Sequence, residues 1–463
     1  MVFSSILFLF VYLVAVIGVY YLLPRKAKNP WLFVTSLLFY GYGEPVLLLL
    51  MLASITLNYV SGYLIERWFD RPKAKKATLI VCVALNLLAL GYFKYTGLLL
   101  DTLRQLPIFA LLPAPEITLP IGISFYTFQA MSYVIDVYWG NCKAQKNFIT
   151  FGTYVVLFPQ LIAGPIVRFV DVQEQLQTRK ESLPLFHNGV KLFVVGLAKK
   201  VLLANPLGAL WGTLRVLSGG VLSAWIGVLA FTLQIYFDFA GYSDMARGLG
   251  NMLGFRFVKN FDYPYISRSI TEFWRRWHIS LGTWFREYVY IPLGGNRKGK
   301  LRQCLNLLIV WGLTGLWHGA SWNFLFWGLY FSLLLIVEKF FLLKPLQKAP
   351  QWVSHAYAMF FVMIGWVIFD FTDTAGMFSY LGQLFDFSKG ILASQAMYPV
   401  MSHLPLLAIG VVACWPMGRK VYDKVSAWQF AWVLEAVVTA IVLLLCIAAL
   451  VSSTYNPFLY FRF

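Results

Sequence analysis

The sequence is poor in charge for its length. Of its 463 residues only 13% are charged and 59% are hydrophobic, whereas roughly 25% of the residues in soluble domains are charged. So little polar surface cannot cover a water-facing fold of this size, and the lipid bilayer must be the main solvent of the chain. The five cysteines are scattered and form no CxxC pair, so we expect no disulfide framework.

Several catalytic signatures are absent as well. The sequence has no HExxH motif and no cluster of cysteines and histidines, so we expect no metal site. It has no GxSxG elbow and no GxxxxGK(S/T) loop. These absences argue against a serine hydrolase of that fold and against an ATP-driven pump.

Long apolar runs are abundant, and many approach the roughly 20 residues that span roughly 30 Å of hydrocarbon. Because they are continuous and do not alternate with period two, they predict an all-α polytopic membrane protein and not a barrel. We expect about ten to twelve crossings, some of them re-entrant, in a single domain of residues 1–463. The longer runs are 3–23, 45–65, 77–100, 117–139, 220–238, 320–343, 353–371, 397–415 and 427–451, and the shorter ones are 30–42, 150–165, 190–206 and 303–318.

Most of the positive charge lies in short loops between the apolar runs. The net charge of +18 therefore indicates a positive-inside bias, with no nucleic acid as partner. We expect a multi-pass protein of the bacterial inner membrane, surrounded by lipid, with both termini outside. The loops that we place in the cytoplasm are 25–28, 67–76, 143–146, 168–200, 247–302, 339–348 and 419–424.

Residues 238–302 are the richest in polar and aromatic side chains. They are too polar to cross as one helix and too aromatic for an ordinary loop, which predicts interfacial helices at the cytoplasmic face. Asp238 and Asp244 stand here in apolar surroundings. They either orient a catalytic group or pair with arginines of the same segment, and the sequence favours pairing.

Two of the five histidines stand out by their surroundings. His318 interrupts the apolar helices expected over residues 303–343, and an ionisable group in such a place indicates a functional site by default. Gly315 and Gly319 beside it would let a ligand or another helix approach closely. His278 follows Trp274 by four residues, so the two would share one helical face. A structural hydrogen bond by either histidine stays open as the alternative.

Basic residues surround these histidines in the sequence. Arg275 and Arg276 lie beside His278, and Arg297, Lys298 and Lys300 lie in a glycine-rich loop between the two histidines. Such cations suit the phosphates of a cytosolic donor. Basic glycine-rich loops are also common between membrane helices, so positive-inside bias remains the alternative.

Motifs along the whole chain resemble the membrane-bound O-acyltransferases, and within them the branch that O-acetylates bacterial polysaccharides such as alginate or peptidoglycan. The opening MVFSS (residues 1–5) and the ending NPFLYF (456–461) both match. The internal matches are LPIGISFYTFQ (119–129), FPQLIAGPIVR (158–168), DFAGYSD (238–244), residues 273–287 and LWHG (316–319).

This resemblance implies a helical bundle around a central funnel, with His318 and His278 as the catalytic histidines. It also implies acetyl-CoA as a donor substrate, no bound cofactor, and an extracytoplasmic esterase-like partner of the SGNH type. We expect His318 to act as the general base. Trp274 and Asn323 are the expected supporting donors to the thioester oxygen.

The resemblance also singles out Tyr460. A small companion protein of the teichoic-acid system ends in a similar aromatic motif, which suggests that Tyr460 relays the acyl group. An aromatic anchor at the membrane interface is the slightly favoured alternative. Two rival functions stay open: D-alanyl transfer to teichoic acid, and a transporter or flippase with broken helices.

Overall fold

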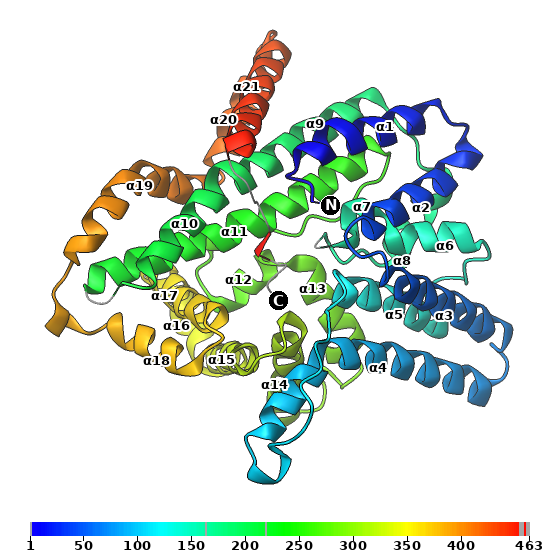
Figure 1. The fold of residues 1–463 in the computed structure, drawn as a ribbon, viewed down its shortest axis with the longest axis horizontal. Helices are drawn as coiled ribbons and strands as arrows, with labels where there is room; N and C mark the ends of the chain where they lie inside the picture. The colour runs from blue at the N-terminus through cyan, green and yellow to red at the C-terminus, as the bar shows by residue number, and fades with distance from the viewer. Residues whose placement is uncertain (1, 163, 218–219, 453–457, 460–463) are drawn as a thin grey trace. The chain divides into compact units, whose positions relative to one another are not determined.

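The computed structural model describes residues 2–162, 164–217, 220–452 and 458–459. Within these ranges the regular structure is helical and contains no strand, from α1 (Leu13–Leu22) to α21 (Ala431–Ser452), as Figure 1 shows. The all-α class expected from the continuous apolar runs is therefore confirmed.

Eight helices in the described part of the chain are long and apolar enough to cross a membrane. Because roughly 20 residues span the hydrocarbon core, these helices make the protein a multi-pass membrane protein. They are α3 (Leu48–Arg67), α4 (Pro72–Arg104), Leu183–Leu214, α11 (Val221–Met252), Trp322–Lys348, α17 (Gln351–Asp370), α19 (Ser394–Ala413) and α21.

The remaining apolar runs form shorter or more charged helices. One is the π-helix η1 (Phe8–Tyr12) continued by α1, and the others are α2 (Arg25–Gly41), α5 (Ile123–Trp139), α6 (Phe148–Val156), α7 (Phe158–Leu161) and α14 (Lys300–His318). Together with the eight long helices they account for every apolar run of the sequence. The connections between the apolar runs contain further short helices, among them η2 (Pro107–Phe109), α8 (Phe169–Thr178), α18 (Thr374–Gln383), η7 (Phe387–Lys389) and α20 (Met417–Val425).

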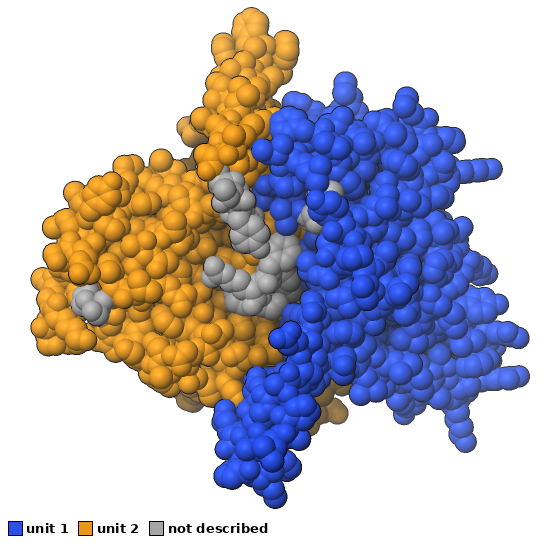
Figure 2. All heavy atoms as spheres, in the orientation of Figure 1, with its two compact units in different colours: residues 1–193, 245–258 blue, residues 194–244, 259–463 orange. Residues whose placement is uncertain are grey.

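The chain divides into two compact units, coloured in Figure 2. Unit 1 comprises residues 1–193 and 245–258, and unit 2 comprises residues 194–244 and 259–463. Two of the three boundaries fall within helices α9 (Leu183–Ala198) and α11, and the third lies in the non-helical segment that follows α11. The expectation of a single domain stays a prediction.

Unit 1 is held together by polar contacts between its helices. Asn58 of α3 and Asn86 of α4 are buried and exchange two hydrogen bonds, with Nδ2 to Oδ1 distances of 3.0 and 3.1 Å. In apolar surroundings such side-chain amides hold helices together, because leaving them unpaired would be unfavourable. Arg179 makes a comparable buried contact, donating from Nε to the Tyr20 hydroxyl at 3.0 Å.

Unit 2 contains the tightest helix crossing near the predicted site. Helix α14 packs on α15 (Trp322–Val337) through Gly315 and Gly328, whose Cα atoms approach so closely that a Cβ at Gly315 would lie 3.4 Å from the Gly328 Cα. The same Cβ would lie 2.2 Å from the backbone oxygen of Phe324. Only glycine fits at this crossing, and the contact fixes the end of α14.

The first part of the segment 238–302 continues a long helix. Helix α11 runs through Asp238 and Asp244 to Met252, and the position of residues 238–302 at the cytoplasmic face stays a prediction. Both carboxylates are paired with cations of the π-helix η3 (Lys199–Ala204), which lets the helix continue in apolar surroundings. Lys200 lies 2.5 Å from Asp238, and Lys199 lies 2.6 Å from Asp244.

From Lys259 onward the expected short helices are present. They are η4 (Pro264–Ile266), α12 (Ile270–Arg276), α13 (Ile279–Phe285) and the π-helix η5 (Arg286–Tyr290), followed by turns up to α14. After α15 come the π-helix η6 (Glu338–Leu342), α16 (Leu343–Lys348) and α17. The Trp322–Lys348 span is made of α15, η6 and α16, and the Leu183–Leu214 span is made of α9, η3 and α10 (Asn205–Leu214).

Candidate active site

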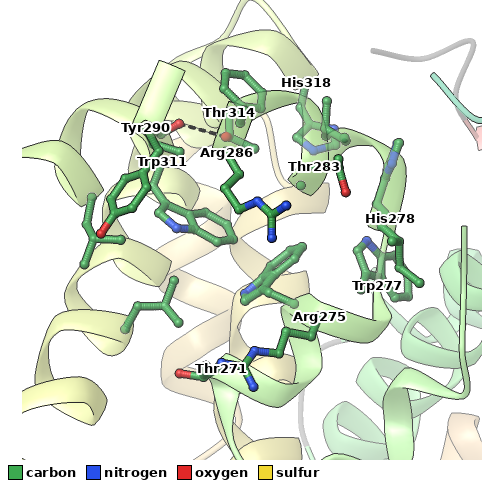
Figure 3. A pocket seen from close by; sticks show the side chains of 18 residues that line it. Thr271, Arg275, Trp277, His278, Thr283, Arg286, Tyr290, Trp311, Thr314 and His318 are labelled. Atoms are coloured by element: carbon green, nitrogen blue, oxygen red, sulfur yellow. Dashed lines mark hydrogen bonds between the residues drawn. The ribbon is translucent and has the colours of Figure 1, made fainter. Parts of the chain in front are cut away.

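Unit 2 contains an open cavity of about 440 Å³ that both predicted histidines line. Its walls come from α12, α13, η5 and α14, with Leu335 of α15, and Figure 3 shows the lining side chains. Tryptophans supply much of the wall, namely Trp274, Trp277 and Trp311. A mainly apolar cavity with a few polar groups is the usual form of a small-molecule site.

His318 is the last residue of α14 and is 5% exposed. Its ring packs edge to face on the rings of Trp327 and Phe369, with centroids 5.0 and 5.3 Å apart. These contacts fix the ring, and its place in the cavity wall leaves it able to meet a ligand there.

The glycines beside His318 serve helix packing. A Cβ at Gly319 would lie 2.1 Å from the ring of Phe324, and Gly315 faces the backbone of the same residue. Of the two roles left open by the sequence, approach by another helix is the one that the structure has. Gly315 and Gly319 hold His318 by letting α15 come close.

His278 lies in a turn between two helices. Helix α12 ends at Arg276, and His278 adopts a left-handed conformation with φ of 46° as the residue before α13. The expected shared helical face with Trp274 is therefore wrong, although both residues line the same cavity. Left-handed geometry is unfavourable for most L-residues by roughly 1–2 kcal/mol, and it is found preferentially at functional sites.

Asn260 holds this turn in place. Its backbone oxygen accepts from Ile279 N at 2.9 Å, and its side-chain Oδ1 accepts from the N and Oγ of Ser280, both at 3.0 Å. Asn260 is buried. These three bonds to the residues after His278 offset the strain of the left-handed turn.

Burial sets the protonation of His278. Desolvation lowers the pKa of its imidazole from 6.5 to about 4, because removal from water disfavours the charged form. The ring is therefore neutral near pH 7 and retains one N–H donor. A neutral, weakly basic imidazole is better suited to donate a hydrogen bond than to take up a proton.

Trp274 supplies a second donor at the cavity wall. Its ring packs against Trp311 and Phe331, with centroids 4.6 and 4.9 Å apart. The indole Nε1 is buried and has no hydrogen-bond partner among the described residues. Buried polar groups are normally hydrogen-bonded, so the unpaired indole of Trp274 is singled out among the residues of the cavity.

The predicted donor-binding cations fall into different places. Arg275 lines the cavity, whereas Arg276 is paired with Glu272 and Asp262, at 3.0 and 3.5 Å. Arg297, Lys298 and Lys300 are exposed and lie outside the cavity lining. Their loop is a tight turn, held by a 2.9 Å bond from Asn306 Nδ2 to the Gly295 oxygen. The left-handed φ of 55° at Gly295 belongs to this turn.

The remaining predicted residues have structural partners. Asn323 donates from Nδ2 to the backbone oxygens of Ile368 and Phe369, at 3.2 and 3.0 Å. Asp238 pairs with Lys200 and Asp244 pairs with Lys199, whereas the sequence analysis named only arginines as partners. Tyr460 lies outside the described residues.

The structure brings to the site further polar residues that were not predicted from the sequence. Arg286 of η5 lines the cavity, and Figure 3 shows its guanidinium pointing into it. Thr271, Thr283 and Thr314 also line it, and the Thr314 hydroxyl donates to the Val310 oxygen at 2.7 Å. Arg286 lies within the matched motif of residues 273–287, which was a signal that could have identified it.

Glu338 is a further residue that the sequence analysis missed. Its carboxylate is fully buried and accepts from the backbone N–H groups of Ile270 and Thr271, both at 2.7 Å, and from the Thr271 hydroxyl. These bonds hold the start of α12, the helix that carries Trp274 and Arg275. An acidic residue at the end of a long apolar run was the available signal.

Comparison with known proteins decides the family. The family model for the membrane-bound O-acyltransferases matches residues 145–381. A Pseudomonas putida protein named "Probable alginate O-acetylase AlgI" is 39% identical over the full length of both chains. The chain belongs to the membrane-bound O-acyltransferase family. It is an acyltransferase, as the sequence motifs predicted.

Two further relatives bear on the branch of this O-acyltransferase. The peptidoglycan O-acetyltransferase of Helicobacter pylori is 33% identical over 80% of this chain and 77% of its own length. The teichoic acid D-alanyltransferase of Streptococcus thermophilus is 30% identical over 48% of this chain and 58% of its own length. All the cavity-lining residues, from Thr271 to Leu335, fall within the part matched by the family model.

Proposed function

We propose that this acyltransferase takes acetyl from cytosolic acetyl-CoA and passes it across the bacterial inner membrane, for O-acetylation of an extracytoplasmic polysaccharide. The observation that carries the proposal is that His278 and His318 line one and the same tryptophan-walled cavity. The family membership supplies the reaction class, acyl transfer to oxygen.

The chemistry assigned to the cavity is attack of a hydroxyl on the acetyl thioester. The hydroxyl oxygen bonds to the carbonyl carbon, the carbon–sulfur bond breaks, and the hydroxyl proton passes through His318 to the sulfur of CoA. A positioned general base of this kind typically gives 10²- to 10⁴-fold acceleration.

His278 and Trp274 take a different role from His318. Since His278 is neutral and weakly basic, it donates to the thioester oxygen as negative charge develops there. The buried Trp274 Nε1 supplies a second donor to the same oxygen. Asn323 acts indirectly, because its amide holds the backbone of Phe369, whose ring contacts His318.

The direction of transfer rests on the distribution of charge. Basic loops, including residues 247–302, face the cytosol under the positive-inside rule. Acetyl-CoA is cytosolic and the glycan lies outside, so the acyl group must cross within the protein. An extracytoplasmic SGNH-type transferase is the proposed partner that completes transfer to the polymer.

Alginate is the favoured acceptor. The relative named for alginate aligns over the whole of this chain at 39% identity, whereas the one named for peptidoglycan aligns over 80% of it at 33%. Peptidoglycan is the second candidate. D-alanyl transfer is disfavoured, since the relative named for it aligns over only 48% of this chain.

Tyr460 is proposed as the acyl relay. The residues before it are buried in unit 2: Leu459 N donates to Asp238 Oδ2 at 2.9 Å, and the Phe458 ring packs on Tyr242. The phenol, with a usual pKa near 10, is more easily deprotonated than a sugar hydroxyl. If the Tyr460→Phe variant still acetylated the glycan, the role of this segment would be that of an aromatic anchor at the membrane interface.

Purified protein in proteoliposomes with labelled acetyl-CoA tests the proposal. We expect CoA release, and label on mannuronate oligomers when the partner transferase is added. His403→Ala serves as the control for His318→Ala, because it removes an imidazole outside the cavity. If only peptidoglycan fragments were labelled, peptidoglycan would replace alginate as the proposed acceptor. If the wild-type protein released no CoA, acetyl-CoA would be ruled out as the donor.

A further inference from the structure

A second hollow in unit 2 adjoins the cavity. It has a volume of about 1030 Å³, and it is formed by α12, α16 and the start of α17. Thr271 and Arg275 line both the cavity and this hollow, which we call the basic cleft. The two spaces are therefore neighbours on the same short helix.

Positive charge dominates the basic cleft. Its lining includes four cations, Arg268, Arg275, Arg276 and Lys348, and one carboxylate, Glu272. Glu272 is already paired with Arg276 at 3.0 Å. Among the described residues no carboxylate forms an ion pair with Arg268, Arg275 or Lys348. Three cations in one hollow thus lack an ion-pair partner in the part of the chain that the structure describes.

The cations stand on elements that are tied together. Glu338 holds the start of α12, and Ser354 of α17 donates from Oγ to the Leu346 oxygen of α16 at 2.7 Å. The first turn of the 20-residue helix α17 also faces the cleft through Gln351. A helix start of this length adds to the attraction for anions.

We propose that the basic cleft binds the phosphate groups of the acyl donor while its thioester end occupies the cavity. This inference rests on the proposed function. Acetyl-CoA has a polyanionic nucleotide at one end and an uncharged arm at the other. The cleft supplies charge and the tryptophan-walled cavity supplies an apolar surface, with Arg275 at the junction.

The basic cleft takes the role of phosphate site that the sequence analysis gave to the glycine-rich loop. Arg297, Lys298 and Lys300 project from an exposed turn that lines neither the cavity nor the cleft. Arg268 and Lys348, which are far apart in the sequence, are brought to one hollow by the fold. Charge-assisted contacts to phosphate are the strong class of hydrogen bond.

The test uses the full-length protein and two donors, acetyl-CoA and S-acetylpantetheine, which lacks the nucleotide. The double variant Arg268→Gln/Lys348→Gln should raise the KM for acetyl-CoA about ten-fold or more. The same variant should leave kinetics with S-acetylpantetheine unchanged, because the missing charges have no phosphate to meet. The matched control is Lys420→Gln/Lys424→Gln in α20, which removes the same charge elsewhere.

Three outcomes would overturn the inference. The first is an equal change for both donors. The second is a raised KM for acetyl-CoA in an Arg297→Gln/Lys298→Gln/Lys300→Gln variant but not in the cleft variant. The third is a cleft variant whose KM for acetyl-CoA is unchanged but whose thermal stability, unlike that of the wild-type protein, is no longer raised by nanodiscs of phosphatidylglycerol. That result would assign these cations to lipid headgroups. In each case wild-type turnover of acetyl-CoA persists, whereas failure of the proposed function would abolish it.

Discussion

The two histidines are held in the same cavity by opposite means. His278 stands in a left-handed turn between α12 and α13, and hydrogen bonds that buried Asn260 accepts fix that turn. His318 ends α14, and close packing of glycine against α15 and of aromatic rings fixes it. The first region depends on polar contacts and the second on shape, so changes to the two regions should fail differently.

The largest effect is expected from His318→Ala. If His318 is the general base, its removal should lower kcat by about 10²- to 10⁴-fold, while expression and membrane insertion stay normal. Labelled-acetyl transfer by the purified variant measures this, with His403→Ala alongside. Near-normal transfer by a correctly inserted His318→Ala protein would contradict the assignment.

Activity should depend on the hydrogen-bond donor that the side chain of residue 278 supplies. His278→Ala should lower kcat by about 10²-fold or more, the usual effect of losing one donor to a developing oxyanion. His278→Gln keeps an N–H donor and carries the same left-handed backbone, so we expect it to retain more activity than the Ala variant. If Ala prevented stable insertion while Gln restored full activity, the side chain would be making a structural bond.

Gly315→Ala tests the packing that holds His318. The added Cβ would lie 2.2 Å from a backbone oxygen, and such overpacking typically lowers stability by about 1–3 kcal/mol. Gly312→Ala is the matched control, since its Cβ would meet only a Leu325 side-chain carbon at 3.9 Å. A thermal shift with purified protein should separate the two variants, and equal melting temperatures would contradict the tight crossing.

A further prediction concerns the pH dependence of stability. The folded pKa of His278 is about 4, below its unfolded value of about 6.5, so between these values the unfolded state binds a proton that the folded state does not. Stability should therefore fall as pH is lowered through this window, by about 1 kcal/mol per pH unit, and His278 should add no slope above it. His278→Gln should show a shallower acid slope, and identical slopes would argue against a buried neutral imidazole.

Much of the fold was accessible from the sequence because the bilayer imposes length on apolar helices. Every apolar run became a helix, and the paired roles of Asp238 and Asp244 followed from the difficulty of leaving carboxylates alone in apolar surroundings. Their lysine partners were not predictable, because the π-helix η3 that presents them has no clear sequence signal.

For the candidate site, the sequence identified the histidines that line the cavity better than it identified the cations. His278 and His318 were identified by unusual surroundings and by the family motifs, and both line the cavity. Local spacing failed for Trp274 and His278, because Asn260, distant in sequence, stabilises a turn where a continuous helix was expected. Proximity in the sequence likewise favoured Arg297 and Lys298, whereas tertiary packing joins Arg268 to Lys348.

A structure of the full-length protein with a non-hydrolysable acetyl-CoA analogue tests the central claim most directly. The account predicts the acetyl group in the cavity between His278 and His318, its carbonyl oxygen within hydrogen-bond distance of His278 or Trp274, and the phosphates in the basic cleft. An analogue bound with its acetyl group outside this cavity, in a protein that still turns over acetyl-CoA, would contradict it.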